Sequence, residues 1–288
     1  MADTLPVHVI GASGRSGAAL CRALRDAGVP YVPVVRDAGR WAATGLPGTP
    51  ALADLNDGAA LTRALAGASR IAITAHARNA AAVLAAAPAA ARLVFLGSTR
   101  RFTRWPDAHG NGVRAGEAAL RASGRPGVML HPTMIYGATG ENNVRRLAAL
   151  LRRLPVVPLP GGGRALVQPV HQSDVTRAVV AALDHPWTGP DSLVVAGGTA
   201  LPYAGFVRAV AQAAGLPPPR ILPVPAAPLR WLAPLTALPG LPRIGADEIR
   251  RLTEDKAFDI TPLGELLGVR PIALDRGLAL TFGDQPCP

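Results

Sequence analysis

The sequence contains almost no lysine and few aromatic residues. Lys256 is the only lysine among 30 basic residues, so arginine carries nearly all of the formal net charge of +11. Either a codon bias toward arginine and alanine or an anionic ligand, such as a phosphate-bearing cofactor or substrate, explains this charge. Aromatic residues amount to 4% and the arginines are scattered, which argues against a base-stacking surface. We therefore expect no nucleic-acid partner.

Cysteines and long apolar runs are also scarce. Cys21 and Cys287 form no C-x-x-C pair, which predicts neither a disulfide framework nor a metal site and favours a reducing compartment. The opening residues, MADTLP, have no basic segment and no long apolar run. The most apolar stretch, 80–97, is interrupted by Pro88 and Arg92, as expected of a buried helix followed by a strand. We expect a cytoplasmic protein with no secretory signal and no membrane contact.

Hydrophobic residues make up 49% of the 288 residues, which indicates a packed globular chain. Short apolar runs alternate with helical patterns in the first half. Strands are predicted over 7–10, 31–35, near 52, and over 71–74, 93–96 and 127–130, and helices over 16–27, 58–65, 77–87 and 112–122. This alternation predicts a Rossmann-type, doubly wound parallel α/β sheet.

The pattern changes after Gly137. Helices are predicted over 144–154, 174–183 and 203–214, with Ser173 as a cap, together with a late strand over 193–195 and a proline-rich stretch over 216–228. We therefore expect an NAD(P)-binding domain over 1–140 and 166–200. The remaining segments, 141–165 and 201–288, are predicted to form a small, mostly helical substrate domain. The oligomeric state is left open.

The glycine-rich segment GASGRSG, residues 11–17, lies between a predicted strand and a predicted helix. Gly11 permits the tight turn, Gly14 allows the backbone to approach a pyrophosphate, and Gly17 allows the helix to pack on the sheet. The start of the helix offers free N–H groups to an anion. The remaining predicted cofactor contacts are Ser13, Arg15, Ser16, Arg36, Asp54, Leu55, Thr74, Ala75 and Pro132.

The end of the second strand reads VVRD, with Arg36 where NAD-selective sites usually place an acid. A guanidinium at Arg36, helped by Arg15, suits the 2′-phosphate of NADP(H). Asp54 and Leu55 end the third strand and are placed to flank the adenine. We expect NADP(H) as the cofactor, with NAD(H) as the alternative.

Several segments resemble the extended and atypical short-chain dehydrogenase/reductases, including the NAD-dependent epimerase/dehydratase and NmrA-like branches. The motifs follow in order as GASGRSG, VFLGSTR, GEAALRASG, HPTMIYG and VQPVHQSDVTRAVVAAL. The resemblance implies hydride transfer at C4 of a nicotinamide. It also implies a catalytic tyrosine, a lysine four residues later, and a Ser or Thr hydroxyl that polarises the substrate.

The sequence departs from the family pattern at the catalytic pair, because no Y-x-x-x-K occurs. Alignment on GEAALRASG puts the tyrosine position near His109 and the lysine position near Val113 or Arg114. His131 also stands where the family favours arginine. The catalytic candidates that remain are Ser98 and Thr99, with Tyr136 or His109 as proton donor.

Two functions stay open at this stage. The first is an NADP(H)-dependent oxidoreductase or epimerase/dehydratase-like enzyme that acts on a small carbonyl, hydroxyl or sugar-nucleotide substrate. The second is a non-catalytic, NmrA-like NADP(H)-binding sensor or assembly protein. An anionic substrate would suit the polar and basic residues after the sixth strand, which are Asn142, Asn143, Arg145, Arg146 and Arg164. The apolar segment 227–244 is equally compatible with a pocket lid, an oligomer surface or a membrane-surface contact.

Overall fold

The computed structural model describes residues 5–137, 143–154, 156–225, 227 and 246–283. A seven-stranded parallel sheet has the order β11-β6-β5-β4-β1-β2-β3. Its strands are β1 (Val7–Ile10), β2 (Tyr31–Val35), β3 (Ala51–Leu52), β4 (Arg70–Ile73), β5 (Arg92–Leu96), β6 (Gly127–Pro132) and β11 (Pro190–Val195). The predicted doubly wound α/β fold is confirmed.

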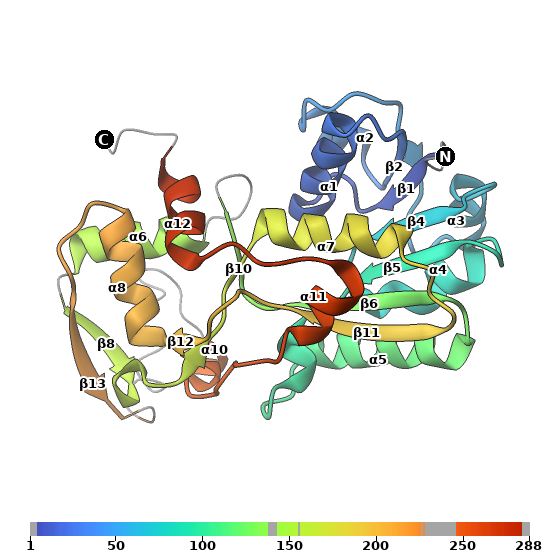
Figure 1. Ribbon diagram of the computed structural model, residues 1–288. Helices are drawn as coiled ribbons and strands as arrows, with labels where there is room; N and C mark the ends of the chain where they lie inside the picture. The colour runs from blue at the N-terminus through green and yellow to red at the C-terminus, as the bar shows by residue number, and fades with distance from the viewer. Residues whose placement is uncertain (1–4, 138–142, 155, 226, 228–245, 284–288) are drawn as a thin grey trace.

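Helices cover both faces of this sheet (Figure 1). One face carries α1 (Arg15–Asp26), α2 (Ala38–Ala42), α7 (Gln172–Asp184) and α11 (Thr261–Leu267), and the other carries α3 (Gly58–Ala64), α4 (Ala80–Ala86) and α5 (Ala108–Ser123). Val9 packs into the α1–α7 layer, and the next residue, Ile10, packs into the α3–α5 layer. The sheet is buried on both sides, which explains why its strands read as continuous apolar runs.

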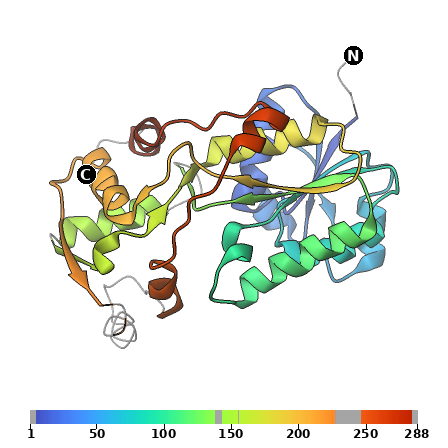
Figure 2. The same cartoon turned by 60° about the horizontal axis from the view of Figure 1, so that its bottom comes forward.

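A smaller lobe is built from the second half of the chain and lies beyond the carboxyl ends of the sheet strands (Figure 1). Its helices are α6 (Asn143–Arg153), α8 (Tyr203–Ala213), α10 (Ala246–Arg251) and α12 (Leu274–Phe282), and its strands are β7 (Ile135–Tyr136), β8 (Val156–Pro160), β9 (Leu166–Val167), β10 (Val170–His171), β12 (Leu201–Pro202) and β13 (Arg220–Val224). Tyr136, Phe206 and Leu278 belong to its separate apolar core. Figure 2 shows the two lobes from a second direction, with the large sheet between α7 and α5.

Helix α11 lies on the large lobe, although the expected substrate region includes its residues. Leu263 and Leu267 pack into the same apolar cluster as Val9 and Val179. The chain therefore crosses to the small lobe, returns to the sheet at α11, and crosses again to α12 (Figure 1).

Three predicted helix starts need correction. The helix predicted over 112–122 is α5, which begins at Ala108 and is capped by Asp107. Helix α7 begins at Gln172 and not at Asp174, and its cap is His171, whose Nδ1 accepts the N–H of Ser173. The predicted Ser173 cap is wrong because this serine already lies within the first turn. The predicted helix 77–87 starts as a single 3₁₀ turn over Ala77–Asn79 before α4 begins.

None of the helices in the described ranges is long and apolar enough to cross a bilayer. Most of the apolar segment 227–244, whose role the sequence left open, falls outside the described residues.

Candidate active site

The glycine loop connects β1 to α1 at the carboxyl edge of the sheet. Gly11 has a φ of +82°, and a Cβ there would come within 3.0 Å of the Thr74 hydroxyl and the Ala75 nitrogen. Thr74 Oγ1 donates to the Ile10 carbonyl at 2.9 Å, which ties the loop to β4. A Cβ on Gly17 would lie 2.2 Å from the Gly11 oxygen. The first and third glycines are therefore required by close backbone contacts, as the motif predicts.

The loop opens into two adjoining cavities that share Gly14, Thr74 and Ala75. We call the first the arginine cavity, about 580 Å³, because its lining includes Arg36, Arg40 and Arg78. We call the second the histidine cavity, about 600 Å³, because its lining includes His76 and His109. Together they form a continuous hollow on either side of the glycine loop.

The structure brings most of the predicted cofactor residues to these cavities. The arginine cavity is lined by Gly11, Ser13, Gly14, Arg36, Asp54, Leu55, Thr74 and Ala75, and the histidine cavity by Gly14, Arg15, Ser16, Thr74 and Ala75. Gly17 lies beneath the loop and lines neither cavity. Pro132 is buried and lines neither, but its carbonyl accepts the Thr99 hydroxyl at 3.2 Å.

Asp37, the acidic residue that follows Arg36, caps a helix with its carboxylate. Asp37 Oδ1 accepts the N–H groups of Gly39 at 2.8 Å and Arg40 at 3.2 Å, and so caps α2. Arg36 is exposed at the rim of the arginine cavity. The end of β2 therefore presents a guanidinium, while the neighbouring carboxylate holds a helix start.

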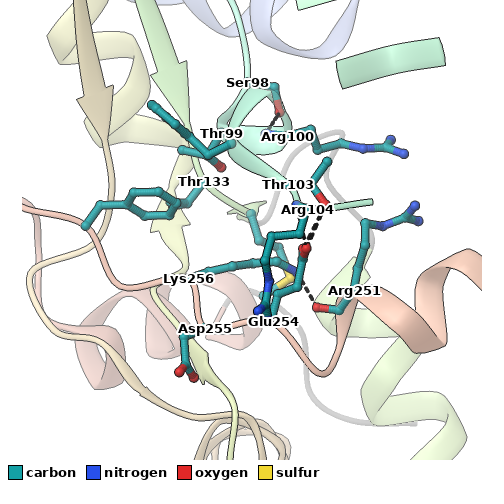
Figure 3. A pocket seen from close by; sticks show the side chains of 13 residues that line it. Ser98, Thr99, Arg100, Thr103, Arg104, Thr133, Arg251, Glu254, Asp255 and Lys256 are labelled. Atoms are coloured by element: carbon teal, nitrogen blue, oxygen red, sulfur yellow. Dashed lines mark hydrogen bonds between the residues drawn. The ribbon is translucent and has the colours of Figure 1, made fainter. Parts of the chain in front are cut away.

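A third cavity, about 630 Å³, lies beyond the end of β5, and we call it the lysine cavity. Its lining residues are Ser98, Thr99, Arg100, Phe102, Thr103, Arg104, Thr133, Met134, Arg251, Glu254, Asp255, Lys256 and Phe258 (Figure 3). Arg100 also lines the histidine cavity, so the two cavities meet at this side chain.

Ser98 and Thr99 differ in the proton that each can offer. Ser98 Oγ accepts the N–H of Arg100 at 3.2 Å, which leaves its own proton free to donate into the cavity. The Thr99 hydroxyl already donates its proton to the Pro132 carbonyl oxygen. A hydroxyl carries one proton, so Ser98 is the better placed donor.

His76 and His109 form a hydrogen-bonded pair in the histidine cavity. The Arg78 N–H donates to His76 Nδ1 at 3.1 Å, and His76 Nε2 lies 3.1 Å from His109 Nδ1. Burial lowers the pKa of His109, and its neighbours His76 and Arg100 lower it further, so the ring is neutral at pH 7. In the neutral pair His76 donates from Nε2, and His109 then carries its proton on Nε2.

Val113 and Arg114, the two residues predicted near the lysine position, point in different directions. Val113 lies one turn after His109 on α5 and lines the histidine cavity with it. Arg114 points elsewhere, because its guanidinium donates to the carbonyls of Arg101 at 2.7 Å and Thr103 at 3.1 Å. The Arg114 guanidinium is therefore held by backbone carbonyls and does not line the histidine cavity.

Tyr136 is the predicted catalytic residue that the structure does not bring to the site. Its side chain is 1% exposed, and its hydroxyl packs so closely on Gly277 that a Cβ there would lie 2.1 Å away. Burial raises its pKa, and Asp174 and Asp275 add to the effect. Tyr136 is a packing residue between β7 and α12, which corrects its prediction as a proton donor.

The family arginine before the proline is replaced by a buried network. His131 Nδ1 accepts the Ser98 N–H at 3.3 Å, and its Nε2 lies 3.4 Å from Glu117 Oε2. Glu117 is buried, and Arg101 Nε and Arg121 Nη2 lie 2.6 Å and 3.0 Å from its carboxylate oxygens. Burial lowers the pKa of His131 to about 4, so it is neutral and arginines supply the positive charge.

Sequence reasoning missed most of the charged residues of the lysine cavity. Arg251 ends α10, and Glu254 and Lys256 follow it, about 150 residues after Ser98 in the chain. No local motif links the two segments. The arginines expected to bind an anion lie elsewhere. Arg145 donates to the Thr281 carbonyl at 3.0 Å, Arg146 and Arg164 line none of the three cavities, and Asn142 lies outside the described residues. Asn143 does line the histidine cavity.

No family model matches the chain. A curated relative, the 3-diazoavenalumate denitrifying reductase of a Streptomyces species, is 35% identical over 109 residues. That match covers 37% of this chain and 33% of the reductase, so the chain aligns with about a third of that protein's length.

Solved structures match over nearly the whole chain. MoeE5 in complex with UDP-glucose and NAD has a TM-score of 0.72 at 22% identity, over 97% of this chain and 98% of that one. The UDP-glucuronic acid 4-epimerase of Bacillus cereus, with UDP-glucuronic acid and NAD, has a TM-score of 0.73 at 15% identity over the same shares. A nucleoside-diphosphate-sugar epimerase of Pseudomonas aeruginosa has 0.72 at 21%, over 97% and 96%. The predicted resemblance to the epimerase/dehydratase group is thus confirmed for the fold.

Proposed function

We propose that the chain is an NADP(H)-dependent reductase of a small molecule held in the lysine cavity. The observation that carries the proposal is Arg100, which lines both this cavity and the histidine cavity. A cofactor on the glycine loop and a ligand beyond β5 would therefore be neighbours. Two of the similar solved structures are named as complexes with NAD, which supports a dinucleotide on the glycine loop.

The glycine loop suits a dinucleotide on its own geometry. The N–H groups at the start of α1 have no side-chain cap, and Gly14 leaves their approach open. NADP(H) rather than NAD(H) is proposed because Arg36 and Arg40 line the arginine cavity and Asp37 is held by the cap of α2. Guanidinium groups suit the doubly charged 2′-phosphate.

A bound nicotinamide supplies a hydride at C4. The chain's part is to hold the acceptor, polarise it and deliver a proton where one is needed. We assign polarisation to the Ser98 hydroxyl and donation to the Nε2 proton of His109. Arg100 adds positive charge between the two cavities and stabilises negative charge that develops there.

We propose reduction rather than epimerisation because neither Val113 nor Tyr136 can act as a base in the cavity. An epimerase must remove a hydroxyl proton as hydride leaves, and this needs a base with a matched pKa. Here an apolar side chain, Val113, lines the cavity one turn after His109, and Tyr136 is buried against Gly277. The curated relative is named a denitrifying reductase of a diazo compound. Replacing an aryl diazonium group by hydride releases N₂ and consumes no proton, so it suits such a site.

The test is oxidation of NADPH against a panel of aromatic aldehydes, aryl diazonium ions and UDP-sugars, with binding of NADPH and NADH measured separately by calorimetry. We expect tighter binding of NADPH and turnover with an aldehyde or a diazonium ion. Ser98→Ala should lose more activity than Thr99→Val, because the Thr99 proton is already engaged. Tight NADPH binding without oxidation by any member of the panel would instead favour the non-catalytic sensor.

A further inference from the structure

The lysine cavity contains four basic and two acidic side chains, and most of them are already paired. Glu254 is 6% exposed and accepts hydrogen bonds from the Thr103 hydroxyl at 2.8 Å and the Arg104 N–H at 2.7 Å. Asp255 Oδ1 accepts the N–H of Leu166 at 2.8 Å. Figure 3 shows Glu254 directed at Thr103. Neutral donors therefore hold both acids in place, and the two carboxylates keep their negative charge.

Two of the arginines share one carboxylate outside the cavity lining. Arg100 Nη2 forms a short ion pair with Asp107, and Arg251 Nη1 lies 3.3 Å from the same oxygen. Asp107 also accepts the Gly110 N–H at 2.7 Å, as the cap of α5. One carboxylate thus serves two guanidinium groups, and a net positive charge remains on this wall.

Two cations of the lining have no carboxylate partner among the described residues, the exposed Arg104 and the half-buried Lys256. Lys256 Nζ donates to the Arg251 carbonyl at 2.9 Å, and within the described ranges no acidic side chain lies within ion-pair distance of it. An ammonium group has three donors, so two remain for a ligand. Burial lowers the pKa of Lys256, against the opposing effect of Glu254. A bound anion would relieve this cost, since it stabilises the charged form.

The rest of the cavity wall is apolar and aromatic. Phe102 and Phe258 have ring centroids 5.6 Å apart at an interplanar angle of 43°, and Met134 lies on the same lining. Phe102 is 46% exposed, although it is a large apolar side chain. Tilted aromatic pairs of this kind accept a further ring by edge or offset contact, and methionine sulfur packs well on aromatic edges.

We propose that the lysine cavity binds a small aromatic carboxylate, with the carboxylate on Lys256 Nζ and the ring against Phe102 and Phe258. Only one part of this assignment rests on the proposed function, namely that the bound carboxylate is the molecule that is reduced. An ammonium beside an aromatic wall fits one carboxylate. A diphosphate would call for several free guanidinium groups, whereas two of the three in this lining already share Asp107.

The single lysine makes a direct experiment possible. Protein made with lysine ¹³C-labelled at Cε gives one Cε signal in ¹H–¹³C spectra, and its position with pH reports the Lys256 pKa. The signal is titrated with cinnamate and with its neutral isostere cinnamamide, and separately with UDP-glucose and inorganic phosphate. We expect cinnamate to move the signal saturably and to raise the pKa, and cinnamamide to bind at least about tenfold more weakly.

A variant pair controls for the charge. Calorimetry measures the affinities of both ligands for each variant. Lys256→Met should lose the preference for cinnamate over cinnamamide, and Lys256→Arg should retain most of this preference. Equal binding of acid and amide, or a response to UDP-glucose or phosphate without one to cinnamate, would overturn the assignment. NADPH is titrated into the same samples: if it binds while cinnamate does not, this inference fails alone. If NADPH does not bind, it is the proposed function that fails.

Discussion

His76 Nε2 lies 3.1 Å from His109 Nδ1, so the proton that His109 can present to the histidine cavity depends on its partner. The chain of donors begins at the Arg78 backbone N–H, which engages His76 Nδ1. Backbone geometry thereby fixes the tautomer of both rings. His109, predicted to lie near the tyrosine position of the resembling family, is thus a neutral histidine with its proton on Nε2.

Replacement of His109 by phenylalanine should lower carbonyl reduction by roughly 10²- to 10⁴-fold, because a positioned donor contributes about that much. Reduction of an aryl diazonium ion should change little, since no proton is consumed. Steady-state rates with both acceptors, and NADPH binding by calorimetry, check the prediction. His76→Phe should show a smaller loss in the same direction, and His76→Gln, which retains a donor, should restore part of it. Equal losses with both acceptors would assign His109 to binding.

Arg36→Ala should weaken NADPH binding by about ten- to a hundredfold and leave NADH binding nearly unchanged. The change removes a charge-assisted contact to the 2′-phosphate, worth about 1.5–3 kcal/mol before screening by solvent. Calorimetric titration of both nucleotides measures the effect. Arg63→Ala is the matched control, because Arg63 is an exposed arginine on α3 that lines none of the three cavities. Wild-type protein that binds NADH as tightly as NADPH would contradict the role given to Arg36.

Gly14→Val should abolish nucleotide binding and leave the fold largely intact. A Cβ on Gly14 meets only the Gly11 oxygen, at 3.1 Å, so the backbone can accommodate it with a small shift. The branched side chain would then fill the space that a pyrophosphate needs. Calorimetry and thermal denaturation separate the two effects. Gly58→Val, at the start of α3 with open space around it, is the control, and Gly17→Val should instead destabilise the protein, since its Cβ would lie 2.2 Å from the Gly11 oxygen.

The sequence predicted those parts of the site that follow from local patterns. Alternating apolar runs located every strand of the large sheet, and the spacing of Gly11, Gly14 and Gly17 located the loop. These features depend on neighbours in the chain. The assignment of each cofactor residue to a nucleotide remains a prediction.

The parts that were missed depend on contacts between distant segments. Lys256 reaches the end of β5 only because the chain returns from the small lobe, and His76 acquires its role only through His109. Tyr136 fits its motif by sequence but is buried by Gly277, 141 residues further along. The absence of Y-x-x-x-K was visible, whereas the choice between Val113 and Arg114 required the orientation of α5.

The stability of the protein should fall as the pH drops from about 6.5 to about 4, and His131 should cause part of that loss. Its side chain is 1% exposed, and burial lowers its folded-state pKa to about 4. Above pH 6.5 the ring is neutral in both states and contributes no pH dependence. Below pH 6.5, His131 binds a proton in the unfolded chain but stays neutral in the folded chain. The unfolded state is therefore increasingly favoured until the pH reaches about 4. A difference of about 2.5 units in pKa corresponds to about 3–4 kcal/mol.

Urea denaturation at a series of pH values measures this dependence through the free energy of unfolding. His131→Gln should show a shallower fall between pH 6.5 and 4 than the wild type, whatever its stability at pH 7, because glutamine does not titrate. Other histidines with lowered pKa, among them His8 and His171, should leave a residual slope. His185→Gln changes a half-exposed histidine outside the Glu117 network and is the matched control. A slope in His131→Gln that equals the wild-type slope would mean that the folded-state pKa of His131 does not lie below its unfolded value, which contradicts the prediction.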